Sequence, residues 1–383
     1  MITLIQNGEV YTPKYVGKQS ILLAGDKIIK VGSIDEKLLM KLNVNVEVIH
    51  ADQSIVVPGF IDPHVHFIGG GGEAGFATRT PEIQLSDLIR SGITTAVGLL
   101  GTDGTTRHMT SLLAKARGLE EEGISTYIYT GNYCVPTPTI TSSVKEDIIL
   151  IDKVIGTGEI AISDFRSSQP SMHELARLAA DATVGGLISG KAGVIHFHTG
   201  PGKNYLAPLH ELLEKYEINA SNLYATHIMR NETLMKDAIA LSNKGVYVDI
   251  TADNNTGKWI SYFKGNGGEM RHLTVSSDGN GSLPKFDDNG ILIGYGVAST
   301  RTLFNELIAA VKTEKLSLEE ILRLVTSNTA NVLQLHKKGG IQESSDADIL
   351  ILDKNSLEIK DVFAKGKHMM KDKEVIVKGT FEH

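Results

Sequence analysis

The sequence predicts an α/β fold, a (β/α)₈ TIM-type barrel joined to a small β-sandwich domain. The middle of the chain alternates short β-branched runs with helical stretches, which is typical of a parallel barrel. Both ends are β-rich, and neither is long enough to build a core alone. We therefore expect residues 1–57 and 338–383 to form the small domain and residues 58–337 to form the barrel. A chain of 383 residues is long enough for both.

The predicted elements follow from local patterns along the chain. β-like runs near the two ends occupy residues 1–13, 20–33, 44–60, 347–353, 357–372 and 374–379. Barrel strands are predicted at residues 56–62, 94–100, 125–131, 159–164, 193–200, 222–228, 245–251 and 272–278. Helices are predicted at residues 81–91, 107–123, 143–156, 172–188, 206–217, 231–245, 300–312 and 317–335. The connection from Ala252 to Gly268 is instead rich in Asn and Gly, so we expect it to be partly mobile.

Composition excludes several classes of protein. The net charge of −7 gives no electrostatic reason to bind nucleic acid, whose partners are usually basic. The single cysteine, Cys134, excludes an intramolecular disulfide and any cysteine-based zinc motif. The N-terminal MITLIQNGEV lacks the pattern of a secretory signal, and no apolar run approaches the roughly 18 residues typical of a membrane span. We therefore expect a cytoplasmic protein with no nucleic-acid or membrane partner.

Histidines and one aspartate stand at the predicted C-terminal ends of barrel strands, where barrels carry their chemistry. His64 and His66 end the first strand, and their i, i+2 spacing lets both imidazoles face one cation. His198 ends the fifth strand, His227 the sixth and Asp278 the eighth. Imidazole and carboxylate donors suit zinc or a similar divalent ion. The sequence therefore predicts a metal site at this end of the barrel.

Each of these residues also has a simpler interpretation. A single histidine inside a barrel is more often a hydrogen-bonded core residue than a ligand, and Asp278 could cap a turn in SSDGNGS. Their convergence on one face favours the metal site. His196 repeats the i, i+2 spacing with His198, so its contribution to the site stays open.

Several motifs resemble those of a known family. PGFIDPHVH resembles the first-strand signature of the amidohydrolase superfamily. Within that superfamily, HFIGGGGEAG, THIMRN, SSDGNGS and further segments as far as the C-terminus resemble the isoaspartyl dipeptidase family, which hydrolyses β-aspartyl dipeptides. The resemblance implies a binuclear metallo-dipeptidase with two divalent ions, Zn²⁺ being the expected ion, a dipeptide substrate and a homo-octamer. The metal ligands that it implies are His64, His66, Glu159, His198, His227 and Asp278.

Glu159 stands where that family usually has a carboxylated lysine that bridges the two ions, and TGE is one residue longer than the family's segment. A glutamate can bridge two ions through its two oxygens without needing carbon dioxide. Its side chain is shorter, but the extra residue could move the backbone to compensate. We expect Glu159 to be the bridge. The alternative is a solvated Glu159 beside a single-metal site.

The resemblance also implies a mechanism. Two ions that share a water make hydroxide available to attack the side-chain amide carbonyl of the substrate. Asp278 would move the proton to the leaving amine, with Glu73 as the next candidate, and Tyr133 would donate to the oxyanion. Arg166 and Arg230 suit the two carboxylates of the substrate, and Glu73, after four glycines, suits its ammonium group. The other substrate contacts implied are Gly71, Thr102, Tyr133 and Ser282.

Two other functions stay open. A cyclic-amide hydrolase of the hydantoinase or dihydroorotase kind would share the metal site, but the set formed by Glu73, Arg166, Arg230 and Ser282 suits a zwitterion rather than a ring. A non-catalytic scaffold is the second alternative, and such relatives typically lose metal ligands. Here the bridging lysine is replaced by another anionic group.

Overall fold

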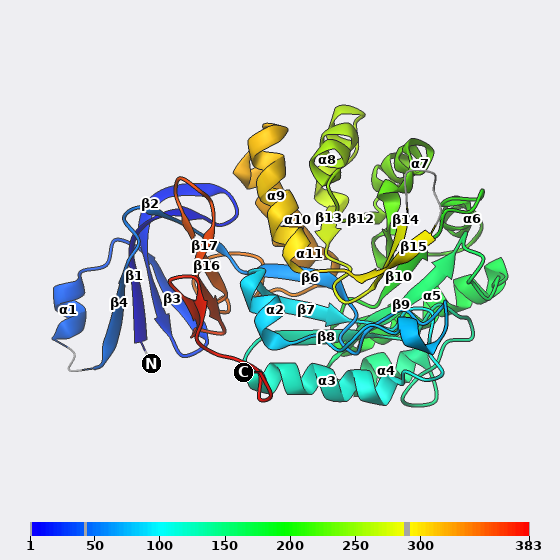
Figure 1. Ribbon diagram of the computed structural model, residues 1–383, viewed down its shortest axis with the longest axis horizontal. Coiled ribbons are helices and arrows are strands. Elements are labelled where there is room, and N and C mark those ends of the chain that lie inside the picture. The colour runs from blue at the N-terminus through cyan, green and yellow to red at the C-terminus, as the bar shows by residue number, and fades with distance from the viewer. Residues whose placement is uncertain (1, 42–43, 287–291, 383) are drawn as a thin grey trace.

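The computed structural model describes residues 2–41, 44–286 and 292–382, and it places a barrel beside a smaller β-sheet (Figure 1). The blue N-terminal strands and the orange-red C-terminal strands lie together at one end of the molecule. The two ends of the chain therefore share one sheet. The predicted α/β class, with a barrel and a smaller β unit, is confirmed.

The barrel wall is an eight-stranded parallel sheet in which each strand pairs with its neighbour in chain order. Its strands are β6 (Phe60–Val65), β7 (Ile93–Gly98), β8 (Ser125–Thr130), β9 (Val154–Ile162), β10 (Val194–Thr199), β11 (Leu223–Thr226), β12 (Tyr247–Thr251) and β13 (Leu273–Ser276). The wall is nearly closed, because the backbone N–H of His66 donates to the Gly279 carbonyl just beyond β13 at 2.8 Å. The C-terminal ends of all these strands therefore meet at one end of the barrel, as predicted.

Helices pack along the outside of the barrel (Figure 1). Their apolar faces supply much of the core; in α9, for example, Leu303, Phe304 and Leu307 are buried. The helices are α2 (Leu85–Arg90), α3 (Met109–Glu122), α4 (Val144–Leu150), α5 (Met172–Ser189), α6 (Ala207–Lys215), α7 (Glu232–Ser242), α8 (Thr256–Gly265), α9 (Arg301–Thr313), α10 (Leu318–Val325) and α11 (Ser327–Val332). Short 3₁₀ segments are η1 (Phe76–Thr78), η2 (Ala220–Asn222), η3 (Ile228–Arg230) and η4 (Met270–His272).

Several elements differ from the sequence-based prediction. The helix predicted at residues 317–335 is divided at Thr326 into α10 and α11, and residues 56–58 of the first predicted barrel strand belong to the smaller sheet. The connection at residues 252–268, where no helix was predicted, contains helix α8, because Ile260 and Phe263 are fully buried one turn apart and this apolar face outweighs the local Asn and Gly content. The fourth helix was predicted to continue to residue 156, but α4 ends at Leu150. The β-branched residues from Val154 onward instead belong to β9, where they pair with β8 and β10.

The remaining strands form a nine-stranded mixed sheet from both ends of the chain. The N-terminal part contributes β1 (Ile2–Tyr11), β2 (Tyr15–Ala24), β3 (Lys27–Gly32), β4 (Val46–His50) and β5 (Ser54–Pro58), with the short helix α1 (Glu36–Met40). The C-terminal part contributes β16 (Ile349–Asp353), β17 (Ile359–Ala364), β18 (Lys367–Lys371) and β19 (Glu374–Val375). β5 pairs with β16 and runs through Gly59 into β6 of the barrel. We propose residues 1–57 with 338–383, and residues 58–337, as the two domains.

A two-stranded hairpin of β14 (Ser282–Phe286) and β15 (Leu292–Val297) follows the last barrel strand. Ser282 and Leu283 at its start reach the cavity described below. Over the residues described, no helix combines the length and the apolar character needed to cross a bilayer.

Candidate metal centre and substrate cavity

A cavity of about 300 Å³ opens at the C-terminal end of the barrel. Every residue predicted for the site lines this cavity except His64, which lies beneath its floor. The lining thus includes His66, Gly71, Glu73, Thr102, Tyr133, Glu159, Arg166, His198, His227, Arg230, Asp278 and Ser282. Residues far apart in the sequence are therefore brought together, because most of them end or follow strands of the same barrel.

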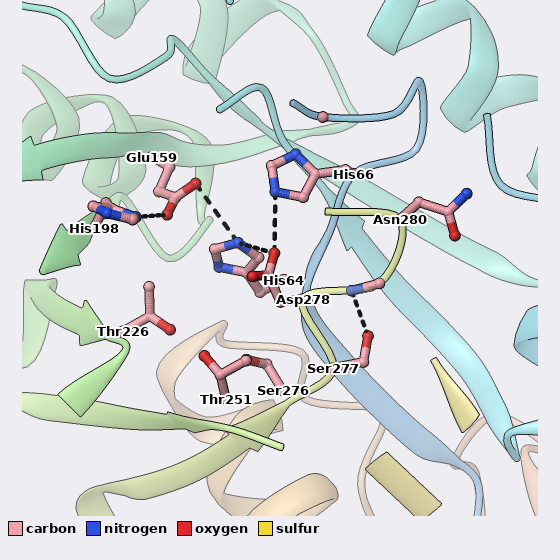
Figure 2. A network of polar contacts seen from close by, with 12 residues as sticks. His64, His66, Glu159, His198, Thr226, Thr251, Ser276, Ser277, Asp278 and Asn280 are labelled. Atoms are coloured by element: carbon pink, nitrogen blue, oxygen red, sulfur yellow. Dashed lines mark hydrogen bonds and ion pairs between the residues drawn. The ribbon is translucent and has the colours of Figure 1, made fainter. Parts of the chain in front are cut away.

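One group of candidate ligands lies where the first and last barrel strands meet (Figure 2). His64 is in β6 and His66 follows it directly. The Oδ1 atom of Asp278 lies 3.3 Å from His64 Nε2 and 3.1 Å from His66 Nε2. Asp278 has a left-handed backbone, with φ of 53°, which a glycine-rich turn after β13 accommodates. Two imidazoles and one carboxylate therefore converge on a single point.

A second group lies across the cavity floor on β9, β10 and the end of β11. Glu159 Oε1 lies 2.6 Å from His198 Nδ1 and 3.1 Å from His227 Nε2. The other oxygen, Oε2, lies 3.6 Å from His64 Nε2 of the first group. Figure 2 shows Glu159 between His198 and His64. Glu159 therefore has one oxygen toward each group, which is the arrangement that a bridging ligand requires.

A β-bulge brings the Glu159 carboxylate into this position. In the pairing of β9 with β10, Gly158 is opposite His196 and Ile160 is opposite Phe197, so Glu159 has no partner in β10. Gly158 has φ of 151°, and a Cβ atom there would lie 2.6 Å from the His196 carbonyl oxygen. The bulge accommodates one additional residue, in agreement with the longer TGE segment seen in the sequence.

The pKa values of the clustered side chains reflect their burial and the charges around them. Burial raises the pKa of Glu159, but the imidazoles of His64 and His198 outweigh burial and hold that pKa well below its usual range. Burial lowers the pKa of His64, but Glu159 and Asp278 outweigh it and raise that pKa to about 9. Burial lowers the pKa of His227 to about 3, so this ring is neutral and can ligate a metal.

Three buried polar atoms at the centre have no hydrogen-bond partner among the described residues: His64 Nε2, Glu159 Oε2 and Asp278 Oδ1. Buried polar atoms of this kind are normally satisfied, so their convergence suits the binding of a cation. Potential ligand atoms form three overlapping groups, and within each group these atoms lie within 4.8 Å of one another. These groups are His64, His66 and Glu159; His64, His227 and Asp278; and Glu159, His198 and His227. The nitrogen and oxygen donors fit divalent ions such as zinc.

Polar neighbours that the sequence reasoning did not assign orient two of these histidines. Thr251 Oγ1 lies 2.6 Å from His227 Nδ1, and Asp164 Oδ2 lies 3.1 Å from His198 Nε2. Both neighbours stand at or just beyond the C-terminal end of a barrel strand, and that position was the available signal. Such outer partners fix the ring orientation of a ligating histidine.

The wall of the cavity carries the charged residues predicted to bind substrate. Asp164 holds Arg166 through two contacts, at 3.0 Å to Nε and 2.8 Å to Nη2. The same guanidinium donates to Glu73 Oε1 at 3.2 Å, and Thr102 donates to that oxygen at 2.9 Å. Burial lowers the pKa of Arg166, but the Asp164 hydrogen bond and the nearby anions outweigh it and raise the pKa. Arg166 and Glu73 are therefore positioned as a fixed pair of opposite charges.

Tyr133 and Arg230 complete the polar lining. The Tyr133 hydroxyl lies 2.8 Å from His198 Nδ1, and burial raises its pKa well above the ordinary value, so it keeps its proton at neutral pH. The Arg230 Nε donates to the Thr199 carbonyl at 2.8 Å, and its side chain is exposed to the cavity. Gly71 has φ of 71° and lies close to Ser282, so a side chain at that position would crowd the loop.

Comparison with known proteins supplies the family. Residues 55–381 match the model of the amidohydrolase family. The chain belongs to the amidohydrolase family. Among solved members, the β-aspartyl dipeptidase of the keratin-degrading thermophile Fervidobacterium islandicum AW-1, in complex with β-Asp-Leu dipeptide, is 46% identical. The match covers 98% of both chains with a TM-score of 0.91.

Two cyclic-amide hydrolases match over similar lengths at lower identity. A dihydroorotase of Lactobacillus johnsonii is 25% identical over 416 residues, which covers 96% of this chain and 93% of the dihydroorotase. A D-hydantoinase of Thermus sp. is 15% identical, with a TM-score of 0.68 over 99% of this chain and 97% of that chain. The hydantoinase shares the fold alone at that identity. Identity is therefore much higher to the β-aspartyl dipeptidase than to these two cyclic-amide hydrolases.

Proposed function

We propose that this protein is a binuclear metallo-dipeptidase that hydrolyses the isopeptide bond of β-aspartyl dipeptides. The observation that carries this proposal is the 46% identity, over 98% of both chains, to a β-aspartyl dipeptidase with β-Asp-Leu bound. The charged lining of the cavity supports the same substrate class. Among possible ions, we propose Zn²⁺, since four histidines and two carboxylates make up the donor set.

The two groups of ligands would each hold one ion. His64, His66 and Asp278 would hold the first, His198 and His227 the second, and Glu159 would contribute one oxygen to each. Divalent ions in such a site lower the pKa of a shared water toward neutrality and polarise the scissile carbonyl. Glu159 is anionic without any assembly step, so it offsets part of the positive charge of both ions.

Side chains of the protein would transfer the protons and stabilise the charge that develops on the substrate. Asp278, at the centre of the first group, would accept the proton of the attacking water and deliver it to the leaving amine. Tyr133 stays protonated and faces the cavity, so its hydroxyl can donate to the oxyanion that develops from the substrate carbonyl. Asp164 keeps the Arg166 guanidinium in place while substrate binds.

The substrate is a zwitterion, and the Glu73–Arg166 pair matches it. Without substrate these two side chains neutralise each other at 3.2 Å. A bound dipeptide would place its ammonium group on Glu73 and a carboxylate on Arg166, with Arg230 binding the second carboxylate. Gly71, Thr102 and Ser282 would complete the contacts around the ammonium end. A cyclic amide carries no ammonium group for Glu73 to bind, which disfavours the cyclic-amide alternative.

The scaffold alternative is disfavoured by the ligand set, because relatives without activity typically lose ligands and here all six candidate positions carry metal-binding side chains. We also propose that the protein assembles as a homo-octamer, on the basis of the resemblance described in the sequence analysis. Light scattering coupled to size-exclusion chromatography tests this assembly, and a monomer in solution would reject it.

Turnover of β-Asp-Leu compared with α-Asp-Leu tests the proposed function. We expect the metal-loaded protein to hydrolyse the β-linked dipeptide and to leave the α-linked isomer intact, because only the β-linked isomer keeps its charged groups where Glu73 and the arginines lie. Hydantoin and dihydroorotate serve as the competing substrates. Equal rates on both dipeptides, or activity on the cyclic amides alone, would reject the assignment.

A further inference from the structure

His196 lies one layer below the metal centre and was left unassigned by the sequence. It is two residues before His198 on β10, so both side chains point into the barrel. His198 reaches the cavity, whereas His196 is completely buried and lies behind His64. Inward-facing residues of a barrel stack in layers, and this spacing places His196 one layer deeper than His198.

The contact with His64 is direct. His196 Nε2 lies 2.8 Å from His64 Nδ1, and the two rings meet edge-on with an interplanar angle of 64°. Tyr129 stacks on the His196 ring with a centroid separation of 5.0 Å, and Tyr224 contacts the ring at 4.6 Å. Two aromatic rings therefore hold the imidazole, and His64 Nδ1 is closed off from solvent because His64 is fully buried.

The opposite nitrogen of His64 faces the candidate ligands. His64 Nε2 lies 3.3 Å from Asp278 and 3.6 Å from Glu159, and it has no hydrogen-bond partner among the described residues. A neutral imidazole carries its proton on one nitrogen only. If Nε2 binds a metal ion, Nδ1 must keep the proton and donate it. The acceptor that lies within reach is His196 Nε2.

We propose that His196 is a positioning residue that accepts the Nδ1–H hydrogen bond of His64 and thereby presents His64 Nε2 to the metal ion. This inference rests on the metal centre of the proposed function, but not on its substrate. Ligating histidines more often donate to a carboxylate or a backbone carbonyl. A neutral imidazole fills the same role here without adding negative charge beneath a centre that already contains Glu159 and Asp278.

Metal binding by the metal-free protein and by four single-residue variants tests this role. His196→Phe keeps a ring between the two tyrosines and removes the acceptor. His196→Gln keeps an acceptor close to the Nε2 position, whereas His196→Asn is polar but too short to reach it. Tyr224→Phe is the matched control in the same layer, because it keeps the ring and removes a hydroxyl that contacts Thr274 and Asp249 rather than a candidate ligand.

The measurement is a Co²⁺ titration in competition with a chelator, followed through the visible spectrum of the bound ion. We expect His196→Phe and His196→Asn to weaken one equivalent about 10- to 100-fold, the usual loss for an outer partner of a ligating histidine. The other equivalent, held by His198 and His227, should keep its affinity. His196→Gln and Tyr224→Phe should bind both equivalents nearly as wild type does.

Two results would overturn the proposal: a folded His196→Phe variant with wild-type affinity, or a His196→Gln variant as weak as His196→Asn. If His196→Phe does not fold, the metal affinities of His196→Gln and His196→Asn decide the test by themselves, since both substitutions introduce a polar side chain. A protein that binds metal in this pattern but leaves β-Asp-Leu intact would refute the proposed function and support the role of His196.

Discussion

Two buried carboxylates in the same barrel have very different surroundings. Asp249, on β12, receives hydrogen bonds from four hydroxyl groups: Thr226 at 2.8 Å, Thr274 and Ser276 at 2.6 Å each, and Tyr224 at 3.5 Å. Glu159, on β9, contacts imidazoles through one oxygen, and its other oxygen has no hydrogen-bond partner within the described ranges. Both side chains are almost completely inaccessible to solvent.

This difference is what we expect between a structural acid and the acid that we propose as a metal ligand. A hydroxyl group donates its proton at any ordinary pH, so the chain alone satisfies Asp249. An imidazole nitrogen can exchange its proton for a metal ion, so the shell around Glu159 can take up cations and the shell around Asp249 cannot. Burial of a carboxylate is therefore a poor guide to function, and the chemistry of its neighbours is a better one.

The largest effect should come from removing the charge of Glu159. Glu159→Gln keeps the side-chain volume, but it leaves the two groups of imidazoles without their shared anion. Breaking a buried charge cluster costs roughly 3–5 kcal/mol, so we expect loss of one metal equivalent and a fall in kcat/KM of about 10²- to 10³-fold. Metal analysis after dialysis and steady-state kinetics on β-Asp-Leu measure the two quantities.

The Glu159→Lys substitution tests whether a lysine carbamate, formed when bicarbonate is supplied, can replace the Glu159 carboxylate. We expect only partial recovery, because the bulge at Gly158 positions the backbone for the shorter side chain. If Glu159→Gln kept both metal equivalents and full activity, Glu159 would not be a required ligand. One ion held by His64, His66 and Asp278 would then account for the activity.

A smaller effect, confined to the substrate, should follow from Arg230→Met. This residue lies on the cavity wall and not among the ligands. Loss of a charge-assisted hydrogen bond to a carboxylate costs roughly 2–3 kcal/mol, so kcat/KM should fall about 100-fold, with a raised KM and unchanged metal content. A variant within about twofold of wild type would remove Arg230 from substrate binding.

The smallest effect on catalysis should come from Asp249→Asn, the counterpart of Glu159→Gln. The surrounding hydroxyls can rotate to meet the amide, so we expect both metal equivalents to remain. The free energy of unfolding in urea should fall by about 1–3 kcal/mol, the usual penalty for a disturbed buried hydrogen-bond network. Loss of metal from Asp249→Asn would show that the two carboxylates are not functionally distinct.

Much of the fold and the cavity could be predicted from the sequence, because barrels place their chemistry at strand ends and the ligands stand there in the chain. The positions of His64, His66 and Asp278 required no knowledge of packing. The neighbours of the candidate histidine ligands did require such knowledge: Asp164 and Thr251 contact histidines distant in sequence, and the contact of His196 with His64 depends on the depth at which His196 lies.

Helix α8 shows a second reason why the sequence alone did not predict the whole fold. Its sequence contains the Asn and Gly typical of loops, and the buried face of Ile260 and Phe263 decides its conformation only once the neighbouring helix is present. The bulge at Glu159 combines both cases. The resemblance implied one additional residue, but the pairing of β9 with β10 was needed to locate it between the partners of His196 and Phe197.

The central proposal is that Glu159 holds two metal ions in place of an assembled carbamate. The most direct test measures metal equivalents per chain and the rate of β-Asp-Leu hydrolysis in protein purified and assayed without bicarbonate. We predict about two equivalents, as in other two-metal hydrolases, and a rate that added bicarbonate does not change. A single equivalent, or activity that recovers only when bicarbonate is added, would contradict the role of Glu159.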